Sequence, residues 1–166
     1  MLAHSPIHPP THSLTHALTH SVQAGEYVGA STELAAAIES LSTLRLLQLA
    51  TAATPPDRLA QVSSALVSCY LNVSQCQLKL QHWEAADTSC SRVLDIEKSH
   101  IKALFRRGVA RTSLERFEEA MDDLKAACTL DPKSKDIREA HANAKAAHDA
   151  HKQAERQAFG GMFKSE

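Results

Sequence analysis

The middle of the chain repeats itself at an interval of 34 residues. Sliding the sequence by that interval pairs Leu80 with Leu114, Trp83 with Phe117, Glu84 with Glu118, Ala86 with Ala120 and Ile96 with Leu130. A unit of this size is one pair of helices, and it cannot bury its apolar side chains without a neighbour. The interval therefore restricts the chain to a stack of antiparallel helix pairs.

Composition supports this fold class. Aromatic residues make up 4% of the chain, and Ala, Leu, Glu, Lys, Gln and Arg dominate after the first part. We therefore predict an all-α fold. The expected helices cover about residues 31–49, 57–80 with Asp57 as the N-cap, 83–96, 101–114, 117–130 and 134–157. Their short connections make neighbouring helices antiparallel.

The chain divides into four parts on this pattern. We expect a low-complexity leader at 1–22, a partial first repeat at 25–56, two repeats at 57–132, and a capping helix with a tail at 133–166. The leader has His at every fourth position among Thr, Ser and Pro, which predicts disorder. A repeated tetranucleotide would encode most of it, so a misplaced gene start is the alternative. We expect no metal site there, because prolines interrupt any helix that would align the histidines.

Charge and cysteine content exclude several classes of function. The formal net charge is -1, so neither nucleic acid nor an anionic membrane is an expected partner. The sequence has no membrane span and no signal peptide, which favours a cytoplasmic protein. The four cysteines form no C-x-x-C pair, so we expect buried thiols without zinc or disulfides. No cofactor is expected.

Candidate binding residues lie on the first helices of the two repeats, which line the concave groove of such a stack. Asn72 and Arg106 occupy equivalent positions, and Lys102 precedes Arg106 by four residues, which places both cations on one helix face. Arg and Lys suit a carboxylate, and an Asn amide can donate to it. Leu71 and Phe105 would offer apolar contacts. A solvated cationic helix face is the plainer alternative.

The runs from Tyr70 to Trp83, from Lys102 to Gly108 and from Phe117 to Lys125 resemble the tetratricopeptide-repeat (TPR) domain of large immunophilins. That group contains FK506-binding proteins and the forty-kilodalton cyclophilin, and the Ser-Cys and His-Trp pairs are closer to the cyclophilin branch. The resemblance implies a carboxylate clamp for the acidic C-terminal tail of a heat-shock chaperone, of the ninety-kilodalton class rather than the seventy. Asn72, Lys102 and Arg106 match three clamp positions, whereas the other two fall near Thr15 and Thr19, which cannot replace the family's Lys and Asn.

The resemblance also implies a prolyl-isomerase domain upstream of the repeats, and the sequence contains no recognisable part of one. We find no nucleophile motif, phosphate-binding loop or acid and base pair, so no catalytic residue is expected. Two other functions stay open. The chain could be a structural scaffold for a folded partner or for a second copy, or a fragment of a complete immunophilin.

Overall fold

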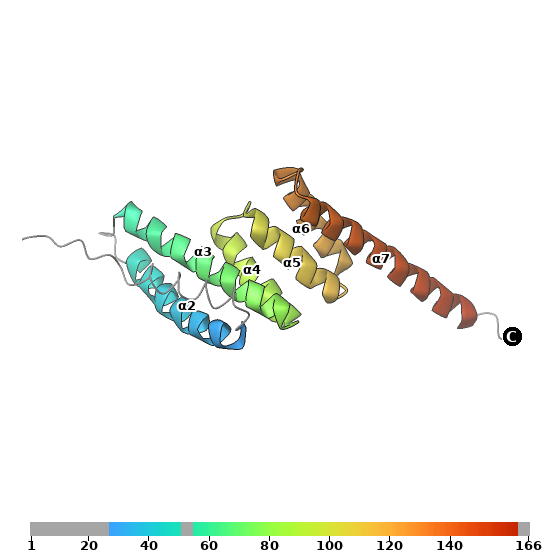
Figure 1. The fold of residues 1–166 in the computed structure, drawn as a ribbon, viewed down its shortest axis with the longest axis horizontal. Helices are drawn as coiled ribbons and strands as arrows, with labels where there is room; N and C mark the ends of the chain where they lie inside the picture. Colours follow the sequence, from blue (N-terminus) through green and yellow to red (C-terminus); the bar gives the residue numbers. More distant parts are fainter. Residues whose placement is uncertain (1–26, 51–54, 163–166) are drawn as a thin grey trace, which may run out of the picture. The chain divides into compact units, whose positions relative to one another are not determined.

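The computed structural model of the chain describes residues 27–50 and 55–162. The helices in these ranges are α2 (Tyr27–Ala50), α3 (Pro56–Lys79), α4 (Trp83–Ile96), α5 (Ile101–Ser113), α6 (Phe117–Leu130) and α7 (Lys135–Met162) (Figure 1). Within the described ranges no strand is present, so the all-α prediction is confirmed.

The chain divides after Leu80 into two compact units. The first contains α2 and α3, which pack against each other. Its buried residues on α2 are Ala30, Leu34 and Leu41, and those on α3 are Leu66, Val67, Cys69, Val73, Ser74 and Cys76. Apart from Ser74, whose hydroxyl donates to the Leu71 carbonyl at 2.8 Å, this interior is made of apolar side chains and thiols.

The second unit contains α4 to α7, and each helix packs against the next. α5 and α6 cross closely at Gly108, since a Cβ added there would lie 2.5 Å from Cγ of Leu124 and 3.2 Å from the Ala120 carbonyl oxygen. Helix α7 packs against α6 and α5 and then runs on past that pair (Figure 1), with residues 151–158 all exposed. The predicted small residues at the helix crossing, Ala86 and Ala120, are fully buried.

The backbone of the connections repeats at the same interval as the sequence. Gln81 and Glu115, 34 positions apart, both have φ of 59°. The residues that follow the ends of α4 and α6, Glu97 and Asp131, have φ/ψ of -131°/90° and -133°/82°. A left-handed residue closes a helix and reverses the chain. Two equal connections therefore confirm a structural repeat over these residues.

Most predicted boundaries agree with the structure. The helices expected at 83–96 and 117–130 have those bounds, while α7 extends to Met162 instead of ending near Gln157. Asp57 is not the N-cap of α3, because Pro55 holds that position and Asp57 lies in the first helical turn. Cys69, Cys76 and Cys90 are buried, Cys128 is half-buried, and all four are free thiols. The expected leader lies outside the described residues.

None of the described helices is long and apolar enough to cross a bilayer.

Candidate functional site

Helix α5 carries the two candidate cations. Its N-cap is His100, whose Nδ1 accepts a hydrogen bond from the Ala103 amide at 3.4 Å. Ala103, Leu104, Gly108 and Ala110 are its buried residues. Lys102 is exposed and Arg106 half-buried, one turn apart on the helix, and Phe105 is half-buried beside them. The structure thus brings Lys102, Phe105 and Arg106 together on α5.

The other candidates belong to the first unit. Asn72 and Leu71 are half-buried residues of α3, and both already take part in interactions within the chain. The positions near Thr15 and Thr19 lie outside the described residues. The predicted clamp residues therefore fall into two sets, with Leu71 and Asn72 on α3 and the other three on α5.

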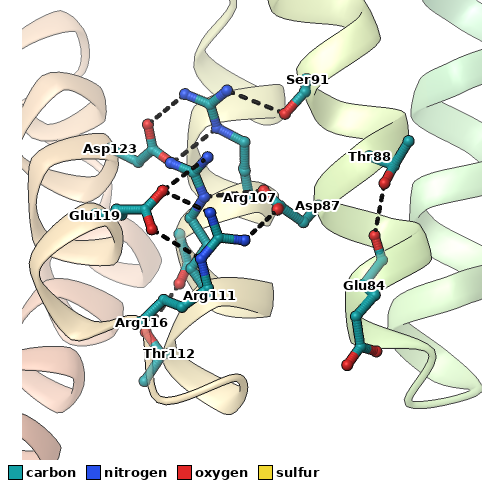
Figure 2. A network of polar contacts seen from close by, with 11 residues as sticks. Glu84, Asp87, Thr88, Ser91, Arg107, Arg111, Thr112, Arg116, Glu119 and Asp123 are labelled. Carbon is teal, nitrogen blue, oxygen red and sulfur yellow. Dashed lines mark hydrogen bonds and ion pairs between the residues drawn. The ribbon is translucent and has the colours of Figure 1, made fainter.

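A network of ion pairs joins α4, α5 and α6 (Figure 2). Arg107 holds Asp123 with two hydrogen bonds, from Nε at 2.8 Å and from Nη2 at 2.7 Å, and its Nη1 donates to Ser91 at 3.2 Å. Arg111 donates to Asp123 at 2.8 Å and to Asp87 at 2.9 Å. Asp123 is 5% exposed, so two arginines neutralise a carboxylate that is almost fully buried.

Arg116 extends this network to the surface. It donates to Asp87 at 2.7 Å and holds Glu119 with two hydrogen bonds, at 2.8 and 2.7 Å. The hydrogen bonds from Arg116 lower the pKa of Glu119, and the same bonds raise the pKa of Arg116. Burial is the largest single influence on Arg107 and lowers its pKa, but the hydrogen bond to Asp123 together with the negative charges of Asp123 and Asp87 outweighs burial and leaves that pKa raised.

The network fixes the rotation of α5 about its own axis. Arg107 and Arg111 are four residues apart, so they share one side of the helix, and both are held by carboxylates of α4 and α6. Lys102 and Arg106 are offset from them by one residue in sequence, about 100° around the helix. The pairs made by Arg107 and Arg111 therefore also determine where the face with Lys102 and Arg106 points.

Sequence reasoning missed this network. A signal was present in the repeat, because Arg107 stands 34 residues after the buried Val73, and Asp123 stands 34 residues after the buried Ser89. A charged residue at a position that is buried in the preceding repeat indicates a buried ion pair. The partners come from separate helices, so the spacing alone did not identify them.

A pocket lies between the α5–α6 turn, the first turn of α6 and the middle of α7. Its lining residues are Glu115, Arg116, Phe117, Glu118, Glu119, His148, His151, Lys152 and Glu155. The Phe117 ring lies 5.7 Å from the His148 ring, which is stacked on it, and 5.5 Å from the tilted His151 ring. Both histidines of α7 therefore contact the aromatic residue of the repeat while His151 stays exposed.

No group of three or more potential metal-binding side chains occurs within residues 27–50 and 55–162.

Comparisons with known proteins show which families and structures this chain is similar to. Residues 101–134 match the family model described as "Tetratricopeptide repeat". A mouse protein named "FK506-binding protein-like" is 42% identical over 96 residues, which cover 58% of this chain and 25% of the mouse protein. Its human counterpart is 40% identical over the same length. The chain thus spans about a quarter of the length of the curated relatives it matches.

Solved structures agree on the architecture. The C-terminal TPR-containing domain of an FK506-binding protein from Plasmodium falciparum superposes with a TM-score of 0.71 at 24% identity, covering 88% of this chain and 91% of that one. The C. elegans myosin chaperone UNC-45, in complex with an Hsp90 peptide, gives 0.66 at 24% identity over 84% of this chain and 14% of its own. The second TPR domain of human RPAP3, in complex with an Hsp70 peptide, gives 0.55 at 23% identity over 81% and 98%.

The fold is therefore a tetratricopeptide-repeat helical fold. The resemblance to the repeat domain of large immunophilins is confirmed on the FK506-binding side, where the curated relatives carry that name. The closer similarity to the cyclophilin branch stays a prediction.

Proposed function

We propose that this chain is a protein-binding adaptor that holds the acidic C-terminal tail of a heat-shock chaperone in its repeat groove. Lys102 and Arg106 would bind the carboxylates, with Asn72 as an additional donor. The observation that carries the proposal is the pair of cations one turn apart on α5, inside the residues that match the repeat family. Two TPR proteins of similar fold are solved with chaperone peptides, which supports this class of partner.

The chemistry of the α5 face suits a peptide carboxylate. Arg106 can bind it through two parallel hydrogen bonds, and Lys102 adds a second positive charge within reach. Each charge-assisted hydrogen bond contributes about 1.5 to 3 kcal/mol, so three contacts sum to about 4.5 to 9 kcal/mol, a range that runs from millimolar to micromolar affinity. Leu71 and Phe105 are half-buried and would contact apolar side chains of the tail. We propose a preference for the ninety-kilodalton chaperone, as the family resemblance implies.

Binding without catalysis is part of the proposal. Tetratricopeptide repeats form binding surfaces and not reaction centres, and we assign no catalytic residue. We also propose that the protein acts in the cytoplasm. The four-part division given above, with a partial first repeat at 25–56 and two repeats at 57–132, is proposed as its domain organisation.

The α5 pair is tested by removing one charge. Arg106→Ala should weaken binding of a tail peptide ending in Glu-Glu-Val-Asp by at least about tenfold, the loss of one charge-assisted contact. Arg92→Ala is the matched control, because Arg92 is an exposed arginine of α4 whose contact with Asp95 is 3.9 Å long. An equal affinity for Arg106→Ala and Arg92→Ala would refute the assignment of Arg106.

A structural scaffold is the second candidate, and helix α2 favours it. Four large apolar side chains of this helix are exposed: Val28 (65%), Leu44 (47%), Leu46 (68%) and Leu47 (59%). Exposed apolar groups of this size favour association with a second copy or a folded partner. Sedimentation at rising protein concentration tests this, and Leu46→Lys should abolish any self-association. Apolar association persists at high salt, whereas clamp binding weakens.

The third candidate is a piece of a larger immunophilin enzyme. The chain spans about a quarter of its curated relatives, which supports this possibility. An isomerase domain encoded in frame upstream would establish it, and the adaptor would then be one part of that protein.

A further inference from the structure

We propose that the pocket between the α5–α6 turn and α7 binds a basic side chain, an arginine in an extended segment of a partner protein. This site is separate from the α5 cations and does not rest on the proposed adaptor function. Its volume is about 290 Å³, at the lower end of small-molecule pockets, and this size suits one long side chain better than a whole metabolite.

The floor of the pocket is aromatic. Phe117 is 8% exposed, and the rings of His148 and His151 lie against it. The two imidazole rings, with the Phe117 ring beneath them, form an aromatic base for this open depression. A guanidinium group stacks on such rings while keeping its edge free for hydrogen bonds. The floor therefore favours arginine over the compact, strongly hydrated ammonium group of lysine.

The rim of the pocket is acidic. Four glutamates line it, against the two cations Arg116 and Lys152. Arg116 is already bound to Glu119 and to Asp87, so its charge is compensated inside the protein. Glu115 is 72% exposed and Glu155 is 55% exposed in their side chains, and their contacts with His151 are long, at 3.8 and 3.9 Å. These two carboxylates and the exposed Glu118 give the rim its negative charge.

The three remaining carboxylates come from different elements. Glu115 lies in the turn, Glu118 in the first turn of α6 and Glu155 on α7. They therefore surround the ring floor instead of following one helix face. A guanidinium group over the imidazole rings would have carboxylates on several sides, which is the arrangement that its fork of N–H donors can use.

The preceding repeat provides a matched control. Glu84 occupies the position equivalent to Glu118, and Trp83 that of Phe117, but no α7 helix packs against α4 in the described part of the second unit. Glu84 is also exposed and begins a helix in the same way. Glu84→Gln thus removes the same charge at the same repeat position without touching the pocket.

The test uses the full chain and the blocked peptide acetyl-Gly-Arg-Gly-amide, which has no carboxylate for the α5 cations. Titration followed by ¹H–¹⁵N NMR should shift the amides of Phe117, Glu118, His148 and His151 in a saturable way. The citrulline peptide, uncharged and of the same shape, should not saturate them. Glu118→Gln should weaken the arginine peptide by about fivefold, as expected for one exposed ion pair, and Glu84→Gln should leave its affinity unchanged.

Equal responses to arginine and citrulline, or equal losses in Glu118→Gln and Glu84→Gln, would overturn the proposal. Absence of saturable shifts at the pocket would do the same. Binding of the acidic tail peptide is measured separately, so failure of either site leaves the other result intact.

Discussion

The two compact units are built from the same kind of helix hairpin but are stabilised differently. In the α2–α3 unit the buried residues are apolar or thiol-bearing, apart from Ser74. In the α4–α7 unit, arginines of α5 bind carboxylates of α4 and α6 in addition to an apolar interior (Figure 2). Apolar burial is non-directional, whereas buried ion pairs demand particular partners at particular positions. The second unit therefore has the more specific packing.

Exposure of apolar side chains follows the same division. Of the five large hydrophobic residues that are exposed in the described ranges, four lie on α2. Arg45 of α2 also has a buried Nε atom without a hydrogen-bond partner in the described residues, whereas the Nε atoms of Arg107 and Arg111 both donate to carboxylates. The first unit is the better candidate for local opening and for association.

The largest expected effect is loss of the carboxylate at the centre of the network. Asp123→Ala removes the carboxylate that the poorly exposed guanidinium groups of Arg107 and Arg111 share. It should lower the free energy of unfolding of the α4–α7 unit by about 3 kcal/mol. Urea denaturation followed by fluorescence of Trp83, the single tryptophan, measures this unit. Asp122→Ala, an exposed neighbour on α6, should cost less than about 0.5 kcal/mol. Similar losses for both variants would contradict the proposed role of the network.

Gly108 and Gly29 should respond to substitution by alanine in opposite directions. Gly108→Ala forces a methyl group to 2.5 Å from Leu124 and should destabilise the protein by about 1 to 2 kcal/mol. Gly29→Ala on α2 has nothing within 4 Å of the new Cβ and should stabilise it by about 0.5 to 1 kcal/mol through helix propensity. Thermal denaturation compares them. A stabilising Gly108→Ala would show that the α5–α6 crossing is not close.

Thiol labelling compares local opening in the two units. Burial raises the pKa of Cys69, so little reactive thiolate is present in the closed state. Half-buried Cys128 should react with a disulfide reagent first, Cys69 and Cys76 of the α2–α3 unit next, and Cys90 of the α4–α7 unit last. Mass spectrometry of timed samples gives the order. Labelling of Cys90 before Cys69 would show that the α4–α7 unit opens more readily than the α2–α3 unit.

The smallest expected effect is on the free energy of unfolding at low pH. Because the pKa of Glu119 is lower in the folded protein than its ordinary value of 4.5, its contribution is complete above that value and is lost as pH falls through the depressed pKa. The contribution is small, since the Glu119 side chain is 48% exposed and solvent screens the pair. Glu119→Gln should flatten the fall in unfolding free energy as pH drops below 4.5. An unchanged slope would exclude Glu119 from the acid response.

The repeat made much of the fold predictable. Trp83 and Phe117 stand at the first positions of α4 and α6, as the sequence alignment of the two units indicated. Their alanines, Ala86 and Ala120, lie buried at the helix contacts. Such features depend on local periodicity, which a single sequence displays.

The ion network and the α7 pocket could not be obtained in the same way. Arg107 meets Asp123 at a distance of 16 residues in the sequence, and Arg111 meets Asp87 at 24. Neither separation equals the 34-residue repeat interval. The arginines lie on α5, the first helix of its repeat, and their carboxylate partners lie on α6 of the same repeat and on α4 of the preceding one. His148 contacts Phe117 because α7 docks on α6, and the 34-residue repeat does not extend to α7 to indicate that contact.

Calorimetric titration of the full chain with an acidic chaperone-tail peptide, beside its C-terminally amidated form, tests the adaptor function most directly. We predict that the free acid binds in the micromolar range, that its affinity falls with salt, and that the amide binds far more weakly. Absence of binding by both forms would contradict the carboxylate clamp and leave a scaffold, or a part of a larger immunophilin, as the function.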